Sequence, residues 1–173
     1  MIVPVQNVAE YLDQHHYLGR ARRGFAWSDE FGVLVLSSPT SRHLPNDWLE
    51  LTRWCLVGLP NGGSMQWARV AAWLRGSHPA TTVVSYSDPS VGHTGALYRA
   101  CNWLWAPTWQ RLRPPPGVGG SWDGITRQSV KDRWVFPLRP DARRATVLAV
   151  HDKSLVARGC PQYVEPRRIR CAA

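Results

Sequence analysis

A strand, a glycine-containing loop and a helix follow one another in the middle of the chain, and this order constrains the fold most. Residues 48–57 alternate apolar and polar side chains as strands do, and residues 61–64 lead into a helical pattern that ends near Gly76. The β-branched run 81–86 predicts a second strand, which is followed after Asp88 by a second helical pattern. Strands that alternate with helices in this way predict a mixed sheet flanked by helices.

The flanking segments extend this pattern. Residues 5–18 have the apolar spacing of a helix, residues 24–38 predict a hairpin around a polar turn, and residues 133–138 predict a short closing strand. A chain of 173 residues can bury one sizeable core. We therefore expect one domain over residues 1–138, of the α/β (mixed α+β) class, and a basic extension over residues 139–173.

Arg53 stands out within the first of these strands. The period of two places it on the same face as Leu49, Leu51 and Cys55. An arginine in that apolar line is conspicuous, and we treat it as a candidate functional residue.

The net charge of +9 is concentrated in the last third of the chain. Residues 1–110 hold 8 Lys and Arg against 7 Asp and Glu, whereas residues 111–173 hold 13 against 5. This asymmetry favours a polyanionic partner, because Arg and Lys that neutralise phosphates release counterions. Nucleic acid is the first candidate for this partner, and an anionic membrane surface is the second. The remaining alternative is that the chain is a small basic protein that binds neither. The candidate nucleic-acid contacts are Trp109, Arg111, Arg113, Arg127, Lys131 and Arg133.

The cysteines and the hydropathy bound the compartment. Cys55, Cys101, Cys160 and Cys171 form no C-x-x-C pair, which favours free thiols over a zinc ribbon or a redox pair. The sequence holds no uninterrupted apolar run of about 18 residues, and Met1 does not open a signal-peptide pattern. We therefore expect a soluble, intracellular protein with no membrane partner.

The loop Asn61-Gly62-Gly63-Ser64 is a candidate anion site. A glycine pair lets the backbone approach a ligand closely, Ser64 can cap the helix, and the N–H groups of the first helical turn favour negative charge. An ordinary helix start uses the same residues, so the loop alone leaves both interpretations open.

Three chemically useful side chains follow the second strand. Asp88 lies just past its carboxyl end, where open α/β sheets place ligands, and His93 and Tyr98 come next along the chain. A carboxylate, an imidazole and a phenol could position an amine, remove its proton and steady an oxyanion. The structural alternative is that Asp88 caps a turn and Tyr98 is a half-buried helix residue.

The segment from Ser85 to Trp103 resembles the signature of the Mom family. That signature has Ser-Tyr/Phe-Ala-Asp-Pro followed by Gly-His-x-Gly-x-Ile-Tyr-x-Ala, and this chain departs from it at Ser87 and Leu97. Further similar motifs lie in the same order between about residues 15 and 138. They are His16-Tyr17, Leu49-Glu50-Leu51-Thr52-Arg53, the Asn61 to Ser64 loop and the stretch from Lys131 to Leu138.

The resemblance implies an acetyltransferase-like fold, related to the GNAT enzymes, and a phage enzyme that modifies the N6 amine of adenine in double-stranded DNA. The modification is described for the family as methylcarbamoylation, which protects phage DNA from restriction, so the expected location is the cytoplasm of an infected bacterial host. By position, the implied active-site residues are Arg53, Ser64, Asp88 and Tyr98, with Glu50, His93 and Tyr17 as neighbours. In these roles Asp88 is the base or orients the amine, Tyr98 is a donor or acid, and Arg53 and Ser64 bind the transferred group's donor.

The resemblance also suggests cofactors. Acyl-CoA or acetyl-CoA is expected from the fold, with Asn61, Gly62, Gly63 and Ser64 as its loop, although the chain lacks a clear Arg/Gln-x-x-Gly-x-Gly/Ala motif. Iron has been associated with the family, and the candidate ligands here are His16, Tyr17 and His93; structural histidines are the alternative.

Work on a base within a duplex requires that the base be extruded and held against aromatic surface. Trp105, Trp109 and Trp122 are candidates for that contact, whereas Trp67 shares the apolar face of its helix and is expected in the core. Two other functions stay open: an acetyl-CoA-dependent N-acetyltransferase for a protein or small amine, and a non-catalytic DNA-binding module.

Overall fold

The computed structural model describes residues 1–21, 23–42, 44–106, 131–139 and 142. Several predictions lie outside these residues: the nucleic-acid contacts Trp109, Arg111, Arg113 and Arg127, the stacking candidate Trp122, and most of the basic extension. Within the described residues, no helix is both long and apolar enough to span a membrane.

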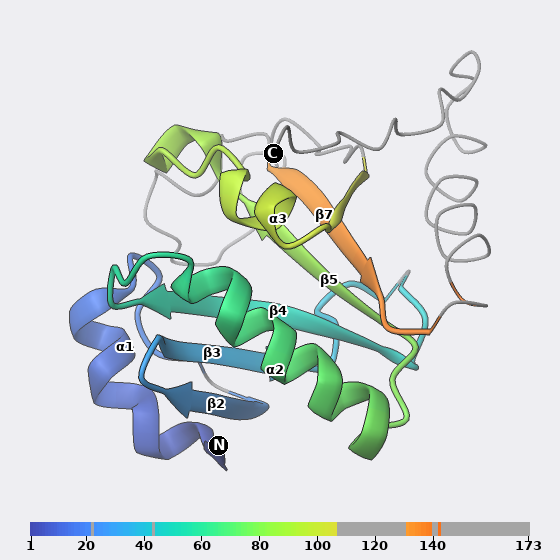
Figure 1. Ribbon diagram of the computed structural model, residues 1–173, viewed down its shortest axis with the longest axis horizontal. Helices are drawn as coiled ribbons and strands as arrows, with labels where there is room; N and C mark the ends of the chain where they lie inside the picture. The colour runs from blue at the N-terminus through green and yellow to red at the C-terminus, as the bar shows by residue number, and fades with distance from the viewer. Residues whose placement is uncertain (22, 43, 107–130, 140–141, 143–173) are drawn as a thin grey trace, which may run out of the picture.

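The described chain forms one mixed sheet with helices on both sides, which confirms the predicted fold class (Figure 1). The strand order is β1-β2-β3-β4-β5-β7-β6, and only the β4–β5 pair is parallel. In chain order the elements are β1 (Ile2–Pro4), η1 (Val5–Val8), α1 (Ala9–His15), β2 (Phe25–Asp29), β3 (Gly32–Ser37), β4 (Trp48–Leu56), α2 (Gly62–Ser77), β5 (Thr82–Ser87), η2 (Pro89–Val91), α3 (Ala96–Ala100), β6 (Leu104–Ala106) and β7 (Asp132–Pro137).

Both helices that the sequence predicts outside α2 are shorter than expected. The first ends at His15, because His16 is extended with φ −117° and ψ 127°. The last ends at Ala100, and Asn102 with a φ of +59° turns the chain out of the helix. The spacing of Leu97, Cys101 and Leu104 predicts that this helix includes Leu104, but Leu104 begins the edge strand β6 instead.

The sequence predicts Arg53 on the same face of the sheet as Leu51, but Arg53 does not lie there, because β4 contains a β-bulge. Val35 of β3 pairs with Arg53, but the next residue, Leu36, pairs with Leu51, so Thr52 is one extra residue in β4. Leu51 consequently packs in the core cluster beneath α2, while Cys55 packs in the cluster beside α1. Arg53 lies two residues before Cys55 and is on the same face of the sheet. It is not on the face of Leu51, because the bulge between them interrupts the period of two.

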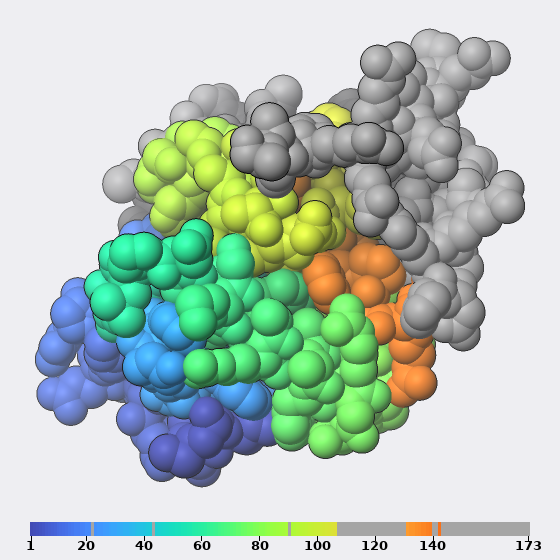
Figure 2. Space-filling model, in the orientation of Figure 1, coloured from blue at the N-terminus to red at the C-terminus, as the bar shows by residue number. Residues whose placement is uncertain are grey.

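The two faces of the sheet are covered by different helices. The apolar side of α2 packs its Trp67, Val70 and Leu74 against one face, and all three are 2% exposed or less. Trp67 is thus a core residue, as predicted. On the other face, Leu12 of α1 and Val8 of η1 cover β2 to β4. Figure 2 shows α2 in green and α3 in yellow-green adjoining on one surface of the molecule.

The parallel pair at the centre of the sheet is short, and this positions the site. β4 and β5 pair only from Trp48 with Thr82 to Leu51 with Ser85. Beyond Leu51 and Ser85 the two strands diverge (Figure 1), and we call this region the split. Parallel strands joined by a helix place their carboxyl ends at one edge, so the residues after β5 lie at the mouth of the split.

Candidate active site

Asp88 follows β5 directly and is fully buried, with 0% of its surface exposed. Its backbone carbonyl accepts from the N–H groups of Val91 and His93 at 3.2 and 3.1 Å, which closes the turn of η2. Among the contacts of its side chain, Lys131 Nζ lies 3.9 Å from Asp88 Oδ2. Asp88 is a buried carboxylate held beside an opposite charge.

Tyr17 is the residue on which the neighbouring groups converge. It lies in the loop after α1, and its side chain is 45% exposed. Burial of part of the phenol and then the negative charge of Asp88 raise the pKa of Tyr17, while the positive charge of Arg53 acts in the opposite direction. Its ring stacks with His16 at 4.9 Å and meets His93 edge-on at 5.0 Å.

Arg53 fixes the loop that carries Tyr17. Its Nε donates to the carbonyl oxygen of Gly19 at 2.8 Å, and Nη2 donates to the carbonyl oxygens of Leu18 and Arg20 at 3.2 and 3.3 Å. Nη1 donates to the carbonyl oxygen of Thr52 at 2.8 Å. Burial lowers the pKa of Arg53 from its ordinary value. A guanidinium has five N–H groups, so most of its donor capacity is used within the protein.

His16 is neutral at physiological pH. Burial, and then the positive charges of Arg53 and His93, lower its pKa to about 4. Its Nδ1 accepts from the backbone N–H of Leu18 at 3.1 Å. His16, Tyr17 and His93 thus touch as stacked and edge-on rings.

That arrangement does not support the predicted iron site. Among the described residues, no group of three or more His, Cys, Asp or Glu side chains is arranged to hold a metal ion. The three iron candidates make ring contacts instead, so we derive no chemistry through iron.

Tyr98 extends from α3 into an aromatic cluster. Its ring stacks on Trp134 at 5.4 Å and meets Trp103 and Trp54 edge-on at 5.2 and 6.0 Å. Tyr98 Oη lies 2.8 Å from Ser85 Oγ. Burial raises the pKa of Tyr98 to about 12, so the phenol is protonated at neutral pH.

The loop at the start of α2 differs from its prediction. Asn61, at a φ of +56°, is the N-cap residue and makes no side-chain capping bond, so the prediction that Ser64 caps the helix is wrong. A Cβ on Gly63 would lie 2.2 Å from Leu97 Cδ1, and one on Gly62 would lie 3.2 Å from Phe31 Cδ1. Both glycines are therefore explained by close packing within the protein.

The two described cysteines are free thiols, as predicted for them. Burial raises the pKa of Cys101 to about 11 and also raises that of Cys55. Cys101 Sγ lies 3.9 Å from Ser64 Oγ, which accepts from it. A protonated, buried thiol is a poor nucleophile, so neither residue favours an acyl-enzyme intermediate.

A match to a protein-family model over the first two thirds of the sequence shows the family of this chain. The model of the Mom protein family matches residues 1–112. The chain belongs to the Mom family. Among solved structures, a Bacillus subtilis acetyltransferase crystallised in complex with CoA is similar over 78% of this chain and 84% of that chain, with 15% sequence identity and a TM-score of 0.39. No curated protein matches the sequence.

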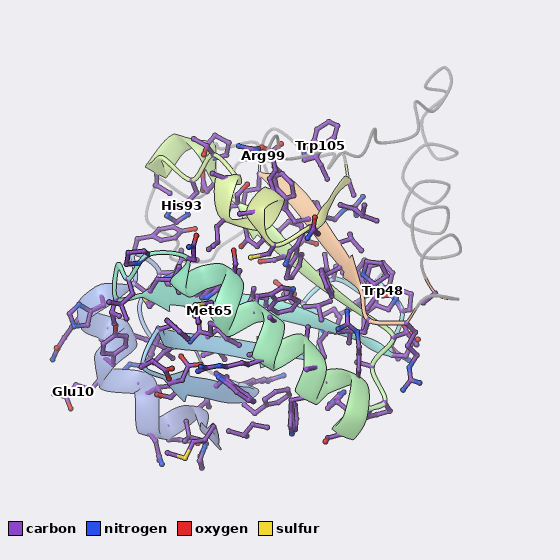
Figure 3. The ribbon with its side chains drawn as sticks, viewed as in Figure 1. Glu10, Trp48, Met65, His93, Arg99 and Trp105 are labelled. Atoms are coloured by element: carbon purple, nitrogen blue, oxygen red, sulfur yellow. The ribbon has the colours of Figure 1, made fainter. Side chains whose placement is uncertain are left out.

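Within this Mom-family chain, the predicted site residues fall into two groups. Arg53, Asp88 and His93 gather around Tyr17. Ser64 and Tyr98 lie on the side of α2 and α3, close to Cys101 and to Ser85. Tyr17 links the two groups electrostatically, because it contributes to the raised pKa of Tyr98. Figure 3 shows His93 above the split and Met65 of α2 below it.

Four other predicted residues occupy definite places. Glu50 Oε2 accepts from the N–H of Thr40 at 2.7 Å. Arg133 on β7 is half-buried and hydrogen-bonded to Tyr86, and burial lowers its pKa, which differs from an exposed phosphate contact. Lys131 lies beside Asp88, as described above. Trp105 is 45% exposed on the edge strand β6.

Sequence reasoning missed Ser85 and the pairing of Lys131 with Asp88. A serine that directly follows the β-branched run Thr82-Val83-Val84 in a buried strand is the signal for the first. The pairing joins residues 43 positions apart, counted from their numbers, and depends on the antiparallel register that places Asp132 opposite Ser87. No periodicity within either segment indicates that register.

Proposed function

We propose that this protein is a transferase that attaches a small acyl-type group, methylcarbamoyl, to the N6 amine of adenine in double-stranded DNA. The observation that carries the proposal is the buried carboxylate of Asp88, beside Lys131 and Tyr17, at the end of β5 in a chain of the Mom family. The family membership supports DNA modification, and the site supplies the groups that such a transfer needs.

Asp88 is the proposed proton acceptor. The exocyclic amine of adenine is a weak nucleophile because its lone pair is conjugated with the ring. As its nitrogen attacks the acyl carbon, a new N–C bond forms, the bond to the leaving group breaks, and one N–H proton must leave. A carboxylate within hydrogen-bond reach accepts that proton, and Lys131 Nζ lies 3.9 Å from Asp88 Oδ2 as an opposite charge.

Tyr17 and its two histidine neighbours provide the proposed surface for the extruded base. An extruded nucleobase is held by stacking on aromatic side chains. Tyr17 is partly exposed, contacts both His16 and His93, and lies close enough to Asp88 for their charges to interact. A stacking surface next to the proposed proton acceptor supports this role, and Trp105 on the edge strand β6 does not offer one.

The donor is proposed only by its chemistry, as an activated acyl or carbamoyl compound. The solved acetyltransferase that resembles this chain was crystallised with CoA. In this chain, however, the space beside Gly63 is filled by Leu97, and the space beside Gly62 is bounded by Phe31. The glycine pair therefore does not fit a backbone cradle for a pyrophosphate, and no step depends on coenzyme A.

Double-stranded DNA is the proposed partner. The excess of Lys and Arg after residue 110 supports it, because phosphate neutralisation gives salt-dependent affinity for any DNA sequence. The proposed role is protection of phage DNA from restriction, in the cytoplasm of the bacterial host.

The test is nucleoside mass spectrometry on DNA from cells that express the chain. We expect a mass increase on deoxyadenosine that is absent from an Asp88→Asn variant, which removes the proton acceptor and preserves the size of the side chain. Glu30→Gln is the matched control, because Glu30 is an exposed carboxylate that pairs with Arg69. Unchanged adduct levels in the Asp88 variant would exclude the assigned role. A wild-type chain that leaves DNA unmodified and acetylates a protein or small amine would replace the proposal with the N-acetyltransferase alternative.

A further inference from the structure

A hydrogen-bond relay closes the base of the split. Ser85 Oγ donates to the carbonyl oxygen of Leu51 at 2.8 Å. Leu51 and Ser85 are also the last residues at which β4 and β5 pair. Tyr98 Oη lies 2.8 Å from the same Ser85 Oγ. The relay therefore connects α3 to the point at which the two central strands separate.

The direction of this relay follows from hydrogen counting. A serine hydroxyl has one hydrogen, and that of Ser85 is donated to Leu51. Ser85 Oγ must then be the acceptor in its bond with Tyr98, and Tyr98 must be the donor. The one hydrogen of the phenol is thus donated within the protein, so in any further hydrogen bond Tyr98 Oη can only be the acceptor.

The surrounding rings hold Tyr98 in this arrangement. Trp134 lies nearly parallel to it, with an interplanar angle of 12°, and its own Nε1 donates to Ser87 Oγ at 2.8 Å. Gly95 allows this packing, since a Cβ there would lie 2.1 Å from Trp134 Cζ2. A phenolic O–H prefers the plane of its ring, so a fixed ring directed at Ser85 also fixes the side from which a lone pair is offered.

We infer that Tyr98 acts as a hydrogen-bond acceptor for the amine of the substrate, and that Ser85 is the positioning residue that sets this role. The inference rests on the proposed function. An exocyclic amine carries two N–H groups: Asp88 accepts the proton that is lost on attack, and Tyr98 Oη accepts a hydrogen bond from the N–H that remains. Tyr98 consequently does not protonate the leaving group.

The protonation state of Tyr98 agrees with this role. With a pKa of about 12, the phenol of Tyr98 is neutral at pH 7. It is therefore not present as a phenolate, the form that could take a proton from the amine. It can hold an N–H in place without taking it. By orienting the amine nitrogen toward the acyl carbon, Tyr98 increases the rate of attack without gaining or losing a proton.

Fluorinated tyrosines at position 98 test whether Tyr98 Oη accepts or donates the hydrogen bond to the substrate. Fluorine makes the phenol a stronger donor and a weaker acceptor, and the high pKa of this site keeps the fluorinated phenols protonated at pH 7. We expect the initial rate of adenine modification to fall by about 2- to 5-fold from tyrosine to 3,5-difluorotyrosine, with 3-fluorotyrosine between them. A rate that rises would make Tyr98 a donor, and a flat series would remove its hydroxyl from the reaction; both overturn the inference. The same substitutions at Tyr11 on α1 are the control and should leave the rate unchanged.

A double-mutant cycle tests the positioning role of Ser85. Tyr98→Phe and Ser85→Ala should each reduce the rate, and the Ser85 change should have little further effect once the hydroxyl of Tyr98 is gone. Additive effects would separate the two residues and contradict the relay. Far-ultraviolet circular dichroism and the melting temperature of each variant identify any loss of folding. If the wild-type chain forms no deoxyadenosine adduct at all, the proposed function fails and the inference fails with it. If the adduct forms but its rate does not fall from tyrosine to 3,5-difluorotyrosine, only the inference is overturned.

Discussion

Arg53 Nε donates to the carbonyl oxygen of Gly19 at 2.8 Å, so that a side chain of the central sheet fixes a loop 34 residues earlier in the chain. The same guanidinium reaches the carbonyls of Leu18 and Arg20. Tyr17 directly precedes this anchored stretch. The position of Tyr17 over the split is therefore set by Arg53 rather than by α1, which ends at His15.

Arg53→Lys should preserve the charge and lose the fork of donors. A lysine ammonium cannot reach three successive carbonyls with the planar geometry of a guanidinium. We expect the rate of DNA modification to fall roughly 10- to 100-fold through displacement of Tyr17, with unfolding free energy reduced by about 1–3 kcal/mol. Arg69→Lys, at an exposed ion pair with Glu30, is the matched control. A lysine variant with wild-type kinetics would show that the loop does not need this anchor.

Gly63→Ala should destabilise the contact between α2 and α3. The new Cβ would lie 2.2 Å from Leu97 Cδ1 and 3.1 Å from Leu56 Cδ1. Overpacking of this kind typically costs about 1–3 kcal/mol. Because the obstacle is the end of a side chain, Leu97→Ala in the same chain should recover much of that loss. Urea unfolding of the two single variants and the double variant measures the coupling, and strictly additive effects would refute the predicted overlap.

Gly95→Ala and Gly92→Ala form a matched pair. Both glycines have a left-handed φ, +77° at Gly95 and +83° at Gly92, so alanine is strained by about 1–2 kcal/mol at either position. Only Gly95 faces an obstacle, Trp134 Cζ2 at 2.1 Å, whereas a Cβ at Gly92 meets nothing within 4 Å. We expect Gly95→Ala to lose about 3 kcal/mol or more of unfolding free energy. Thermal melts that rank the two variants equally would contradict the packing of Trp134 against Gly95.

Gln66→Leu should break a buried polar network beneath α2. Gln66 is 0% exposed; its Nε2 donates to Asp29 Oδ1 at 2.7 Å and to the carbonyl oxygen of Gly32 at 2.9 Å, and its Oε1 accepts from Trp54 Nε1 at 2.7 Å. Leucine would remove all three of these hydrogen bonds, at a cost of roughly 2–4 kcal/mol. The exposed Gln14→Leu is the control, and chemical denaturation should find it within about 0.5 kcal/mol of wild type.

The stability of the protein should decrease with acid in a way that depends on His16. The pKa of His16 is about 4 in the folded protein against an ordinary value of 6.5, so folding favours the neutral ring. The stabilisation is present above pH 6.5 and is lost as the pH falls toward 4. Since the ring is partly exposed, we expect a loss on the order of 1 kcal/mol. His16→Gln should lose less stability than wild type between pH 7 and pH 4.5, and parallel pH profiles for the two proteins would disprove this role.

The sequence predicts the sheet and the main site residues for identifiable reasons. The alternation in β4 and the β-branched run of β5 are local patterns, and so is the loop between them. The bulge at Thr52 is different, because it depends on pairing with β3, and it separates Arg53 and Cys55 from Leu51, which the sequence places on the same face. The donor role predicted for Tyr98 likewise could not account for Ser85, whose single hydrogen is committed by the meeting of β4 and β5.

The early end of pairing between β4 and β5 has a kinetic consequence. A sheet that is continuous separates whatever lies on its two faces, whereas one whose central strands diverge lets a compound on one face react with a compound on the other. Under the proposed function, both reactants are bound at once and the group passes directly between them. The described thiols, which burial keeps protonated, are consistent with this order of events. A transferase built in this way should show sequential rather than ping-pong kinetics when both substrate concentrations are varied.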